Sequence, residues 1–539
     1  MREKPIPEEI LDAFNRYRGY VLLIKGDPGT GKTIFSLELL NELSKNGNGI
    51  YLSTRVSGKY LYDHFPWLKG VLFEENILDT TKGYLIEAKD PKKAVFYSSK
   101  PDFIKTIYER IHHLEKPVTL VIDSWDVIFN DIKEAKDLED NFIEISRDTE
   151  TNVVMITEKQ GKSLDYLVDG ILRFEKKNIE GRRIRLLHID KMRGIKIRKP
   201  SYVFTLESGR IKCFKPFKPL VYSLCGKLCS VCDLFIDKKC KGCVLENESR
   251  EEKCPIYKCL VVKKAKSCDR CAELNSCSIY EKSVEKCIIS GYSPKKLIIK
   301  EWVSTKDGMT HFSSGSEELD AILGGGYRRG SLVLIDVGEG VQDPAYRLFN
   351  YLPVMNFIQQ GRGAIISTVG GADSQEVRNR MCRFVSEKTF DEYVRVLEIN
   401  NPEKDQEKPY IVILEDDTIE AFNDAWVKTQ KELRKKTGKP IYHHFGFDIL
   451  EYRYGEQSLI EETSKITTMI KSNGDLGIAV TKPGLKSKQE LANIASVHLK
   501  IMNIHGFTVF YGIQPITELY LTNVDISKGY PKIKLCPIV

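Results

Sequence analysis

The chain has 539 residues with 42% hydrophobic and 29% charged side chains, and its formal net charge is +7. This composition excludes collagen-like and low-complexity chains, and no apolar stretch reaches the roughly 18 residues of a membrane span. No apolar run follows the N-terminus. We therefore expect a cytoplasmic protein with no membrane partner and with roughly three to four domains.

The positive charge is concentrated in one segment. Residues 175–199 hold ten Lys and Arg residues against three acidic ones, and this excess of seven equals the net charge of the whole chain. Such a segment can be a solvated surface, a surface for nucleic acid or part of a site. No aromatic residue is interleaved with these charges, so nucleic acid is an alternative partner that the sequence does not favour.

The first strong motif follows an expected helix at 6–18 and an expected strand at 20–24. It fits the pattern Gly, four residues, Gly-Lys-Thr, and apolar residues at helical spacing continue to Leu43. Strand, Gly-rich turn and helix in this order are the context of a phosphate-binding loop. The loop consists of Gly26, Asp27, Pro28, Gly29, Thr30, Gly31, Lys32 and Thr33.

This loop predicts ATP and Mg²⁺ as ligands. Backbone N–H groups and a helix N-terminus surround the phosphate oxygens, Lys32 reaches the β- and γ-phosphates, and the Thr33 hydroxyl is placed for Mg²⁺. A later apolar strand at 117–124 carries Asp123 at its carboxyl end, where a carboxylate can hold the Mg²⁺ shell opposite the loop. A third strand ends in Glu158.

The order of these motifs resembles one family. The phosphate loop, Val-Ile-Asp-Ser at 121–124, Ile-Thr-Glu at 156–158 and Lys-Met-Arg-Gly at 191–194 are similar to the KaiC branch of RecA-like ATPases, the relatives of RadA. The resemblance implies that Lys191 and Arg193 reach the nucleotide of a neighbouring subunit, and therefore a homo-oligomer such as a hexameric ring. An arginine held across an interface can stabilise the charge on a transferring phosphoryl group.

One position departs from KaiC-type proteins, which carry paired glutamates after the second strand to orient the attacking water. This chain has Thr54 and Arg55 there, and Glu158 is the acid that we expect to position water instead. We therefore expect either slow hydrolysis of ATP to ADP and phosphate or a nucleotide-gated switch without turnover.

A cysteine-dense block follows the basic segment. Eleven of the fourteen cysteines lie between Cys225 and Cys287, and no histidine occurs among them. All-sulfur sites suit Zn²⁺ or an iron–sulfur cluster, and zinc is favoured for a small module with little core. Disulfides and a radical-SAM cluster are weaker alternatives for a cytosolic chain without a surrounding barrel. The candidate metal ligands are Cys225, Cys229, Cys232, Cys240, Cys243, Cys254, Cys259, Cys268 and Cys271.

The C-terminal part repeats the N-terminal part. Residues 330–335 echo 19–24 at an offset of 311, and residues 361–368 echo 47–54 at an offset of 314. Self-similarity of this kind predicts a duplicated domain.

The second copy lacks the residues that bind phosphate. At the first offset, Asp343 stands where Lys32 should be and Pro344 stands where Thr33 should be. An aspartate repels polyphosphate, and proline removes both the Mg²⁺-binding hydroxyl and a backbone N–H. We therefore expect no ATP in this copy, and we expect Asp448, near the end of another of its strands, to be a capping or surface acid.

The sequence thus predicts an α/β protein with two RecA-like P-loop domains, the second degenerate, flanking a small cysteine-rich metal-binding module. The boundaries are 1–217, 218–290 and 291–539. Within the KaiC relatives, Ile-Pro-Glu-Glu-Ile at 6–10 and Tyr-Leu-Ser-Thr-Arg-Val-Ser at 51–57 most resemble archaeal GvpD-type proteins. Named members of that family regulate gas-vesicle gene expression. The cysteine block resembles a small domain of unknown function.

The resemblance implies an ATP-binding regulator whose nucleotide state controls its assembly or its binding of a protein partner. Two alternatives remain open. One is a DNA-associated RecA/RadA paralogue that uses the basic segment, and the other is a non-catalytic scaffold with structural ATP.

Overall fold

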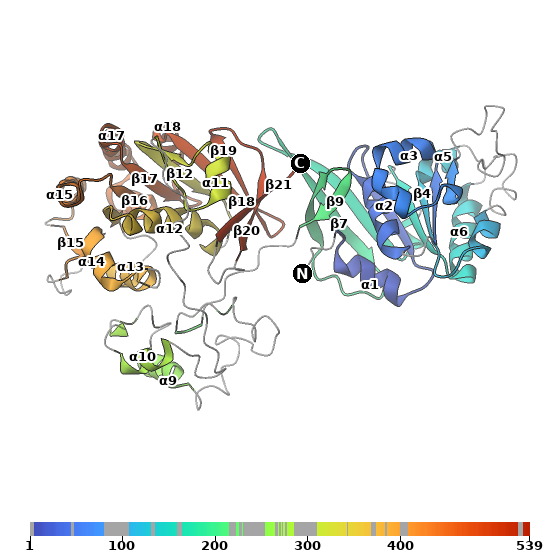
Figure 1. The fold of residues 1–539 in the computed structure, drawn as a ribbon, viewed down its shortest axis with the longest axis horizontal. Helices are drawn as coiled ribbons and strands as arrows, with labels where there is room; N and C mark the ends of the chain where they lie inside the picture. The colour runs from blue at the N-terminus through green and yellow to red at the C-terminus, as the bar shows by residue number, and fades with distance from the viewer. Residues whose placement is uncertain are drawn as a thin grey trace. The chain divides into compact units, whose positions relative to one another are not determined.

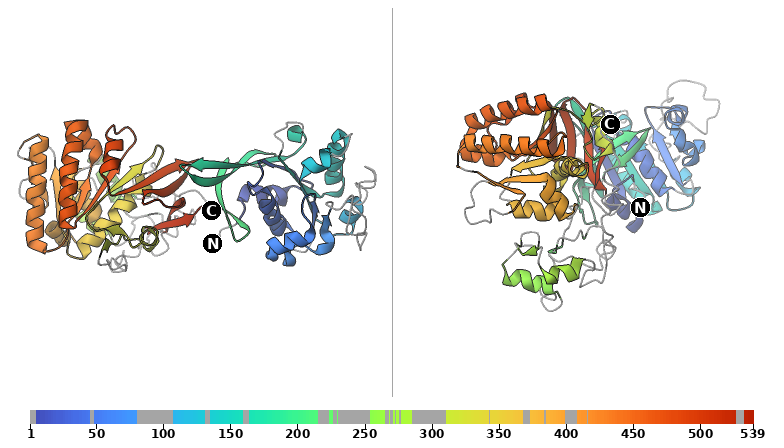
Figure 2. Two further views of the ribbon diagram at one scale, coloured as in Figure 1. Left: turned by 90° about the horizontal axis from the view of Figure 1, so that it is seen from above. Right: turned by 60° about the vertical axis from the view of Figure 1, so that its left-hand side comes forward.

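The structure is a computed structural model. It describes residues 5–44, 48–79, 107–130, 135–158, 164–214, 223–225, 229, 254–264, 268, 271, 273–274, 277–284, 310–341, 343–367, 373–382, 385–398, 408–414, 416–525 and 532–539. The chain divides into two compact units, Met1–Pro216 with Pro537–Val539 (unit 1) and Phe217–Cys536 (unit 2). Each unit holds one large sheet with helices packed on it (Figures 1 and 2). No helix among the described residues is long and apolar enough to cross a membrane.

Unit 1 contains a nine-stranded sheet in the order β3-β2-β4-β5-β1-β6-β7-β8-β9. The strands from β3 to β6 in this order are parallel, and β6 to β9 form antiparallel pairs. The strands are β1 (Val21–Gly26), β2 (Gly49–Ser53), β3 (Ile77–Asp79), β4 (Thr119–Asp123), β5 (Asn152–Thr157), β6 (Gly170–Ile179), β7 (Arg182–Met192), β8 (Ser201–Glu207) and β9 (Arg210–Cys213). The helices are α1 (Glu8–Arg16), α2 (Lys32–Leu43), α3 (Gly58–His64), α5 (Trp125–Asn130) and α6 (Ala135–Thr149), with short turns η1 (Pro66–Gly70), η2 (Glu74–Asn76) and η3 (Leu164–Tyr166).

The parallel strands β1, β2, β4 and β5 are largely apolar and buried, as expected for a parallel sheet covered by helices. Leu23 of β1 belongs to one buried cluster with Phe142 of α6, so α6 covers that face. Trp125, directly after β4, is 2% exposed and joins the same cluster, with its ring centroid 5.3 Å from that of Phe142. Phe35 of α2 instead contacts Phe174 of β6, with 5.1 Å between the ring centroids. The helices and strands predicted around the phosphate loop are confirmed, with ends that differ by at most two residues.

Unit 2 contains a ten-stranded sheet in the order β15-β14-β13-β16-β17-β12-β18-β19-β20-β21, beside a two-stranded pair of β10 and β11. The strands are β10 (His311–Phe312), β11 (Tyr327–Arg328), β12 (Ser331–Val337), β13 (Ala364–Ser367), β14 (Val394–Glu398), β15 (Ile411–Ile413), β16 (Tyr442–Phe445), β17 (Leu476–Thr481), β18 (Val497–Ile504), β19 (Phe507–Gln514), β20 (Tyr520–Asp525) and β21 (Lys532–Pro537). The helices are α9 (Pro255–Val262), α10 (Ser278–Val284), α11 (Glu317–Ile322), α12 (Asp343–Gln359), α13 (Ser374–Met381), α14 (Glu387–Tyr393), α15 (Ile419–Thr437), α16 (Phe447–Tyr454), α17 (Glu456–Asn473) and α18 (Lys488–Ile494).

The two sheets share one topology. Strand β1 in unit 1 and strand β12 in unit 2 occupy the same place in the strand order. Likewise, β2, β4, β5 and β6 of unit 1 correspond in place to β13, β16, β17 and β18 of unit 2. Both sheets are parallel up to this last strand and antiparallel beyond it. Unit 2 adds β15 at one edge. The repeat seen in the sequence therefore corresponds to two sheets with the same order and directions.

Helices cover both faces of the unit 2 sheet. Val333 of β12 lies in one buried cluster with Phe349 of α12. Its neighbour Leu334 lies in a second cluster with Trp426 of α15 and Ile466 of α17. Because successive strand residues point to opposite faces, α12 lies on one side and α15 with α17 on the other.

The cysteine block is described only in part. Cys232, Cys240 and Cys243 lie outside the described residues, whereas Cys229 lies among them. The other candidate ligands are free thiols without a disulfide: Cys225, Cys254, Cys259, Cys268 and Cys271. Within the described parts of the chain, no three His, Cys, Asp or Glu residues are grouped to hold a metal. Cys268 packs on Ile256 and Leu260, and burial together with the nearby Cys225 raises its pKa to about 12. These residues do not support the expected zinc or iron–sulfur site.

Candidate functional site

The turn between β1 and α2 depends on glycine. Gly26 has a φ of 151°, and a Cβ atom there would lie 2.5 Å from the carbonyl oxygen of Phe174 in β6. A side chain would therefore force β1 and β6 apart at their paired ends, where Gly26 lies opposite Phe174. Because the glycines of the loop carry no side chain, the backbone at these positions can approach a ligand closely. A phosphate-binding loop requires this property.

Lys32 is held inside this loop. Its Nζ donates to the carbonyl oxygens of Gly26 at 2.6 Å and Asp27 at 2.8 Å, and the residue is 6% exposed. Burial lowers the pKa of Lys32, while the carboxylates of Glu158 and Asp123 oppose that shift. The Lys32 ammonium group is thus held by backbone carbonyls of the loop. The carboxylates at the ends of two neighbouring strands partly offset the cost of burying its charge.

Thr33 and Asp123 meet across the gap between α2 and β4. The Thr33 Oγ1 donates to Asp123 Oδ2 at 2.6 Å, and the buried Tyr51 hydroxyl of β2 donates to the same oxygen at 2.7 Å. The pKa of Tyr51 is raised mainly by burial and further by the nearby Asp123 carboxylate. The hydroxyl therefore keeps its proton and remains a donor. A hydroxyl and a carboxylate are oxygen ligands of the kind that Mg²⁺ prefers, so the two residues fit that ion.

Glu158 is paired with a cation. Arg55 donates from its two terminal nitrogens to Glu158 Oε1 at 2.6 Å and Oε2 at 3.0 Å. This bidentate hydrogen bonding lowers the pKa of Glu158. Asp126 fixes the strand end beside it, since its carboxylate accepts from the Glu158 backbone N–H at 2.6 Å and from the Thr157 hydroxyl at 2.8 Å. The acid that we expected to orient water is thus bound to the residue that replaces the paired glutamates.

Lys191 and Arg193 lie away from the loop of their own unit. The register pairs Met192 of β7 with Gly170 of β6, near the start of β1, whereas the loop follows the other end of β1. Lys191 Nζ donates to the carbonyls of Asp165 and Val168, both at 2.7 Å. Lys191 is therefore committed to holding the 165–168 segment.

Arg193 is more accessible than Lys191. Its side chain is 50% exposed, and it donates to Asp169 Oδ1 at 3.2 Å and to the Tyr166 carbonyl at 3.0 Å. Of the two residues in the Lys-x-Arg turn, Arg193 is the one that another molecule could reach.

Three site residues escaped the sequence analysis. Tyr51 lies in the middle of an apolar strand, and Asp126 lies in a helix that begins after β4, so no motif marks either of them. Lys176 of the basic segment donates to the Pro28 carbonyl of the loop at 2.9 Å. The basic charge near 176 could have indicated this contact, but the strand pairing that brings β6 beside β1 was needed to locate it.

A glycine turn between a parallel strand and a helix, a buried lysine inside it and a carboxylate at the end of another parallel strand define a P-loop domain. Comparison with known families agrees. Residues 10–190 match the family described as GvpD gas vesicle protein, P-loop domain, and residues 301–539 match GvpD basic region 2. The segment 10–190 belongs to the GvpD P-loop domain family.

Similarity to individual proteins extends over the whole chain. Protein GvpD2 of Halobacterium salinarum is 22% identical over 554 aligned residues, covering 99% of this chain and 96% of the relative. Protein GvpD1 of the same organism is 21% identical over 603 residues with the same two coverages. A UPF0273 protein of Saccharolobus solfataricus is 26% identical over 196 residues, covering 33% of this chain and 69% of the relative. The resemblance to GvpD-type proteins expected from the sequence is thus confirmed.

Proposed function

We propose that unit 1 binds ATP with Mg²⁺ and that the nucleotide state controls assembly of the chain or its binding of a protein partner. The observation that carries this proposal is the convergence of Lys32, Thr33 and Asp123 at the loop. Lys32 would neutralise the β- and γ-phosphates, and Thr33 with Asp123 would hold Mg²⁺. At this site Mg²⁺ would supply positive charge that offsets the negative charge of the phosphates.

We expect ATP hydrolysis to be slow in this proposal, because Glu158, the acid expected to position water, is hydrogen-bonded to Arg55. A carboxylate that orients water needs a free oxygen beside the γ-phosphate, and Arg55 engages both oxygens of Glu158. The pair lies at the surface, with side chains 45% and 26% exposed, so its own stability is about 1 kcal/mol or less. A pair of this strength can open when a partner or a neighbouring subunit offers Arg55 another carboxylate or phosphate.

A homo-oligomer, such as a hexameric ring, completes the proposed site. Arg193 is half-exposed at the end of the sheet opposite its own loop, which supports a contact with the nucleotide of a neighbouring copy. Lys191 then positions the turn rather than the phosphate, because its ammonium already donates to two carbonyls. The families matched are named for a gas vesicle protein, so we place the regulatory role in gas-vesicle formation.

The test compares binding and turnover of ATP in the full chain. Wild type, Lys32→Ala and Arg55→Gln are assayed for Mg²⁺-ATP affinity, for phosphate release and for native mass with and without ATP. We expect ATP to raise the native mass of wild type, Lys32→Ala to lose binding, and Arg55→Gln to bind normally while releasing phosphate at least about tenfold faster.

Each result separates one part of the proposal from the others. An unchanged native mass in every nucleotide state argues against nucleotide-controlled assembly. Turnover that falls in Arg55→Gln shows that Arg55 assists rather than restrains hydrolysis. Salt-sensitive DNA binding that Arg193→Ala and Lys176→Ala abolish would instead favour a DNA-associated protein. Bound nucleotide that survives dialysis without turnover would favour a scaffold with structural ATP.

A further inference from the structure

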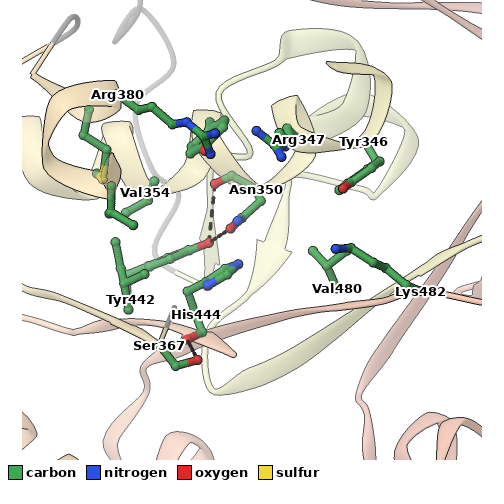
Figure 3. A pocket seen from close by; sticks show the side chains of 14 residues that line it. Tyr346, Arg347, Asn350, Val354, Ser367, Arg380, Tyr442, His444, Val480 and Lys482 are labelled. Carbon is green, nitrogen blue, oxygen red and sulfur yellow. Dashed lines mark hydrogen bonds between the residues drawn. The ribbon is translucent and has the colours of Figure 1, made fainter. Parts of the chain in front are cut away.

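Unit 2 has a cavity of about 160 Å³ at the carboxyl ends of its parallel strands. Its walls come from α12 and α13 on one side and from the ends of β13, β16 and β17 on the other (Figure 3). In open α/β sheets ligands bind outside the carboxyl ends of the strands, so the cavity lies where this class of fold places its sites.

Three cationic side chains border this cavity. Arg347 comes from α12, Arg380 from α13 and Lys482 from the residue after β17, and Figure 3 shows their charged ends directed toward the same space. Lys482 lies 3.4 Å from Asp448, and Arg380 forms an ion pair with Glu376. Neither Asp448 nor Glu376 lines the cavity.

The remaining walls combine polar and apolar groups. Tyr442 and Asn350 are hydrogen-bonded to one another, and the buried His444 lies beside them. Burial lowers the pKa of His444 to about 4, so the imidazole is neutral near pH 7, and its Nδ1 has no hydrogen-bond partner among the described residues. A buried polar atom without a partner is costly unless a ligand or water satisfies it.

Apolar side chains from four elements close the cavity. They are Val354, Ile366, Val377, Met381 and Val480. A carbon skeleton can pack on these groups, whereas a free inorganic ion would leave them uncovered. A cavity of this volume holds roughly six to ten non-hydrogen atoms, since an engineered cavity of about 150 Å³ holds benzene.

We propose that this cavity is a binding site for a small organic dianion of the dicarboxylate class. Arginine forks and an ammonium group recognise carboxylate oxygens, and cations on three separate elements suit a ligand whose two charges are apart. His444, Asn350 and Tyr442 would donate to or accept from its remaining oxygens. The proposal does not depend on ATP binding in unit 1, because the described residues that line the cavity all belong to unit 2.

The test is a calorimetric titration of the full chain with succinate, with malonate and with inorganic phosphate at constant ionic strength. We expect saturable binding of the dicarboxylates, weakened about tenfold or more by Arg347→Gln and by Lys482→Gln. Val354→Phe, which fills the cavity without changing charge, should weaken the same binding. Circular dichroism and thermal unfolding verify that each variant is folded.

Two matched controls make the outcome decisive. Lys465→Gln removes a cation of unit 2 that is 65% exposed, and it should leave succinate binding unchanged. Lys32→Ala should also leave it unchanged, which separates this site from the phosphate loop. The proposal would be overturned if succinate did not bind saturably, or if all three cavity variants bound succinate as tightly as wild type. Loss of succinate binding in Lys32→Ala would also overturn it. Saturation by phosphate alone would overturn the dicarboxylate class.

Discussion

Units 1 and 2 have sheets of the same strand order but different side chains at the same edge. Unit 1 presents a glycine loop with a buried lysine and a threonine–aspartate pair. Unit 2 presents a cavity bordered by two arginines, a lysine and a neutral histidine, and its cations come from two helices and from the residue after β17. The strand order is set by apolar residues throughout each sheet, whereas ligand choice depends on a few residues at the strand ends.

The two units also differ at the start of the helix that follows the first strand of the repeat. Replacing Lys and Thr at the start of the helix by Asp343 and Pro344 removes two groups that bind phosphate and Mg²⁺. The strand ends remain exposed to a ligand because the parallel topology is retained. Substitutions at matched places in the two units test whether the units bind different ligands.

The largest expected effect is on ATP binding. Lys32→Ala removes charge-assisted hydrogen bonds to phosphate, so the affinity of the full chain for Mg²⁺-ATP should fall by about a hundredfold or more, about 3 kcal/mol. Lys482→Ala is the matched change in unit 2 and should leave ATP affinity within about twofold. Equal losses in both variants, measured by calorimetry, would mean that the units do not divide their ligands.

The next effect is on stability and distinguishes the two turns. Gly26→Ala should lower the free energy of unfolding by roughly 2–3 kcal/mol, because the added Cβ would clash with the Phe174 carbonyl and because alanine rarely adopts the φ of this position. Gly340, in the corresponding turn of unit 2, has a φ of 69° and its nearest added contact is 3.7 Å away. Gly340→Ala should therefore cost only about 1 kcal/mol in denaturant unfolding. A reversed order would show that unit 2 kept the tighter turn.

The third effect is a pH dependence that belongs to unit 2. The pKa of His444 is about 4 in the folded chain, whereas an unfolded histidine titrates near 6.5. The unfolded state therefore takes up the proton first, and stability present above about pH 6.5 is lost as the pH falls toward 4, by roughly 2 kcal/mol.

His444→Gln should reduce this loss in thermal unfolding between pH 7 and pH 4. His113→Gln changes an exposed histidine of unit 1 and should leave the loss as it is in wild type. If His444→Gln unfolds with the same pH dependence as wild type, His444 is not kept neutral by burial.

The smallest effect tests two buried tyrosines, one in the sheet of each unit. Tyr51→Phe removes one hydrogen bond to Asp123 and should weaken Mg²⁺-ATP binding by about 1 kcal/mol. Tyr442→Phe removes the hydrogen bond to Asn350 in unit 2 and should leave ATP affinity unchanged while weakening succinate. Equilibrium titration of both ligands against both variants shows whether each tyrosine serves only its own unit.

Contiguous features were predictable from the sequence. The phosphate loop and the strand ending at Asp123 are local patterns whose chemistry depends on a few adjacent residues, and the structure brings Lys32, Thr33 and Asp123 together. The GvpD resemblance was confirmed for the same reason, since it was read from short ordered motifs.

Contacts across the sheet were not predictable. Arg55 and Glu158 are 103 residues apart and meet only because β2, β4 and β5 are neighbours. His444 and Arg380 form part of one cavity without any shared motif, so sequence spacing carries no sign of it. The metal expectation gained no support, since Cys232, Cys240 and Cys243 lie outside the described residues and the described cysteines form no group placed to hold a metal.

The position of Trp125 has a practical consequence for optical measurements. This buried indole directly follows the strand that ends with Asp123, and it packs edge-on against Phe142. Its fluorescence reports on the polarity around the end of β4, so movement of Asp123 toward a bound ion shifts the emission of the unlabelled protein. Trp426 gives unit 2 its own emitter, stacked on the His443 ring. The chain also holds Trp67 and Trp302, so a variant with phenylalanine at three of the four tryptophans is needed to isolate the signal of Trp125 or of Trp426.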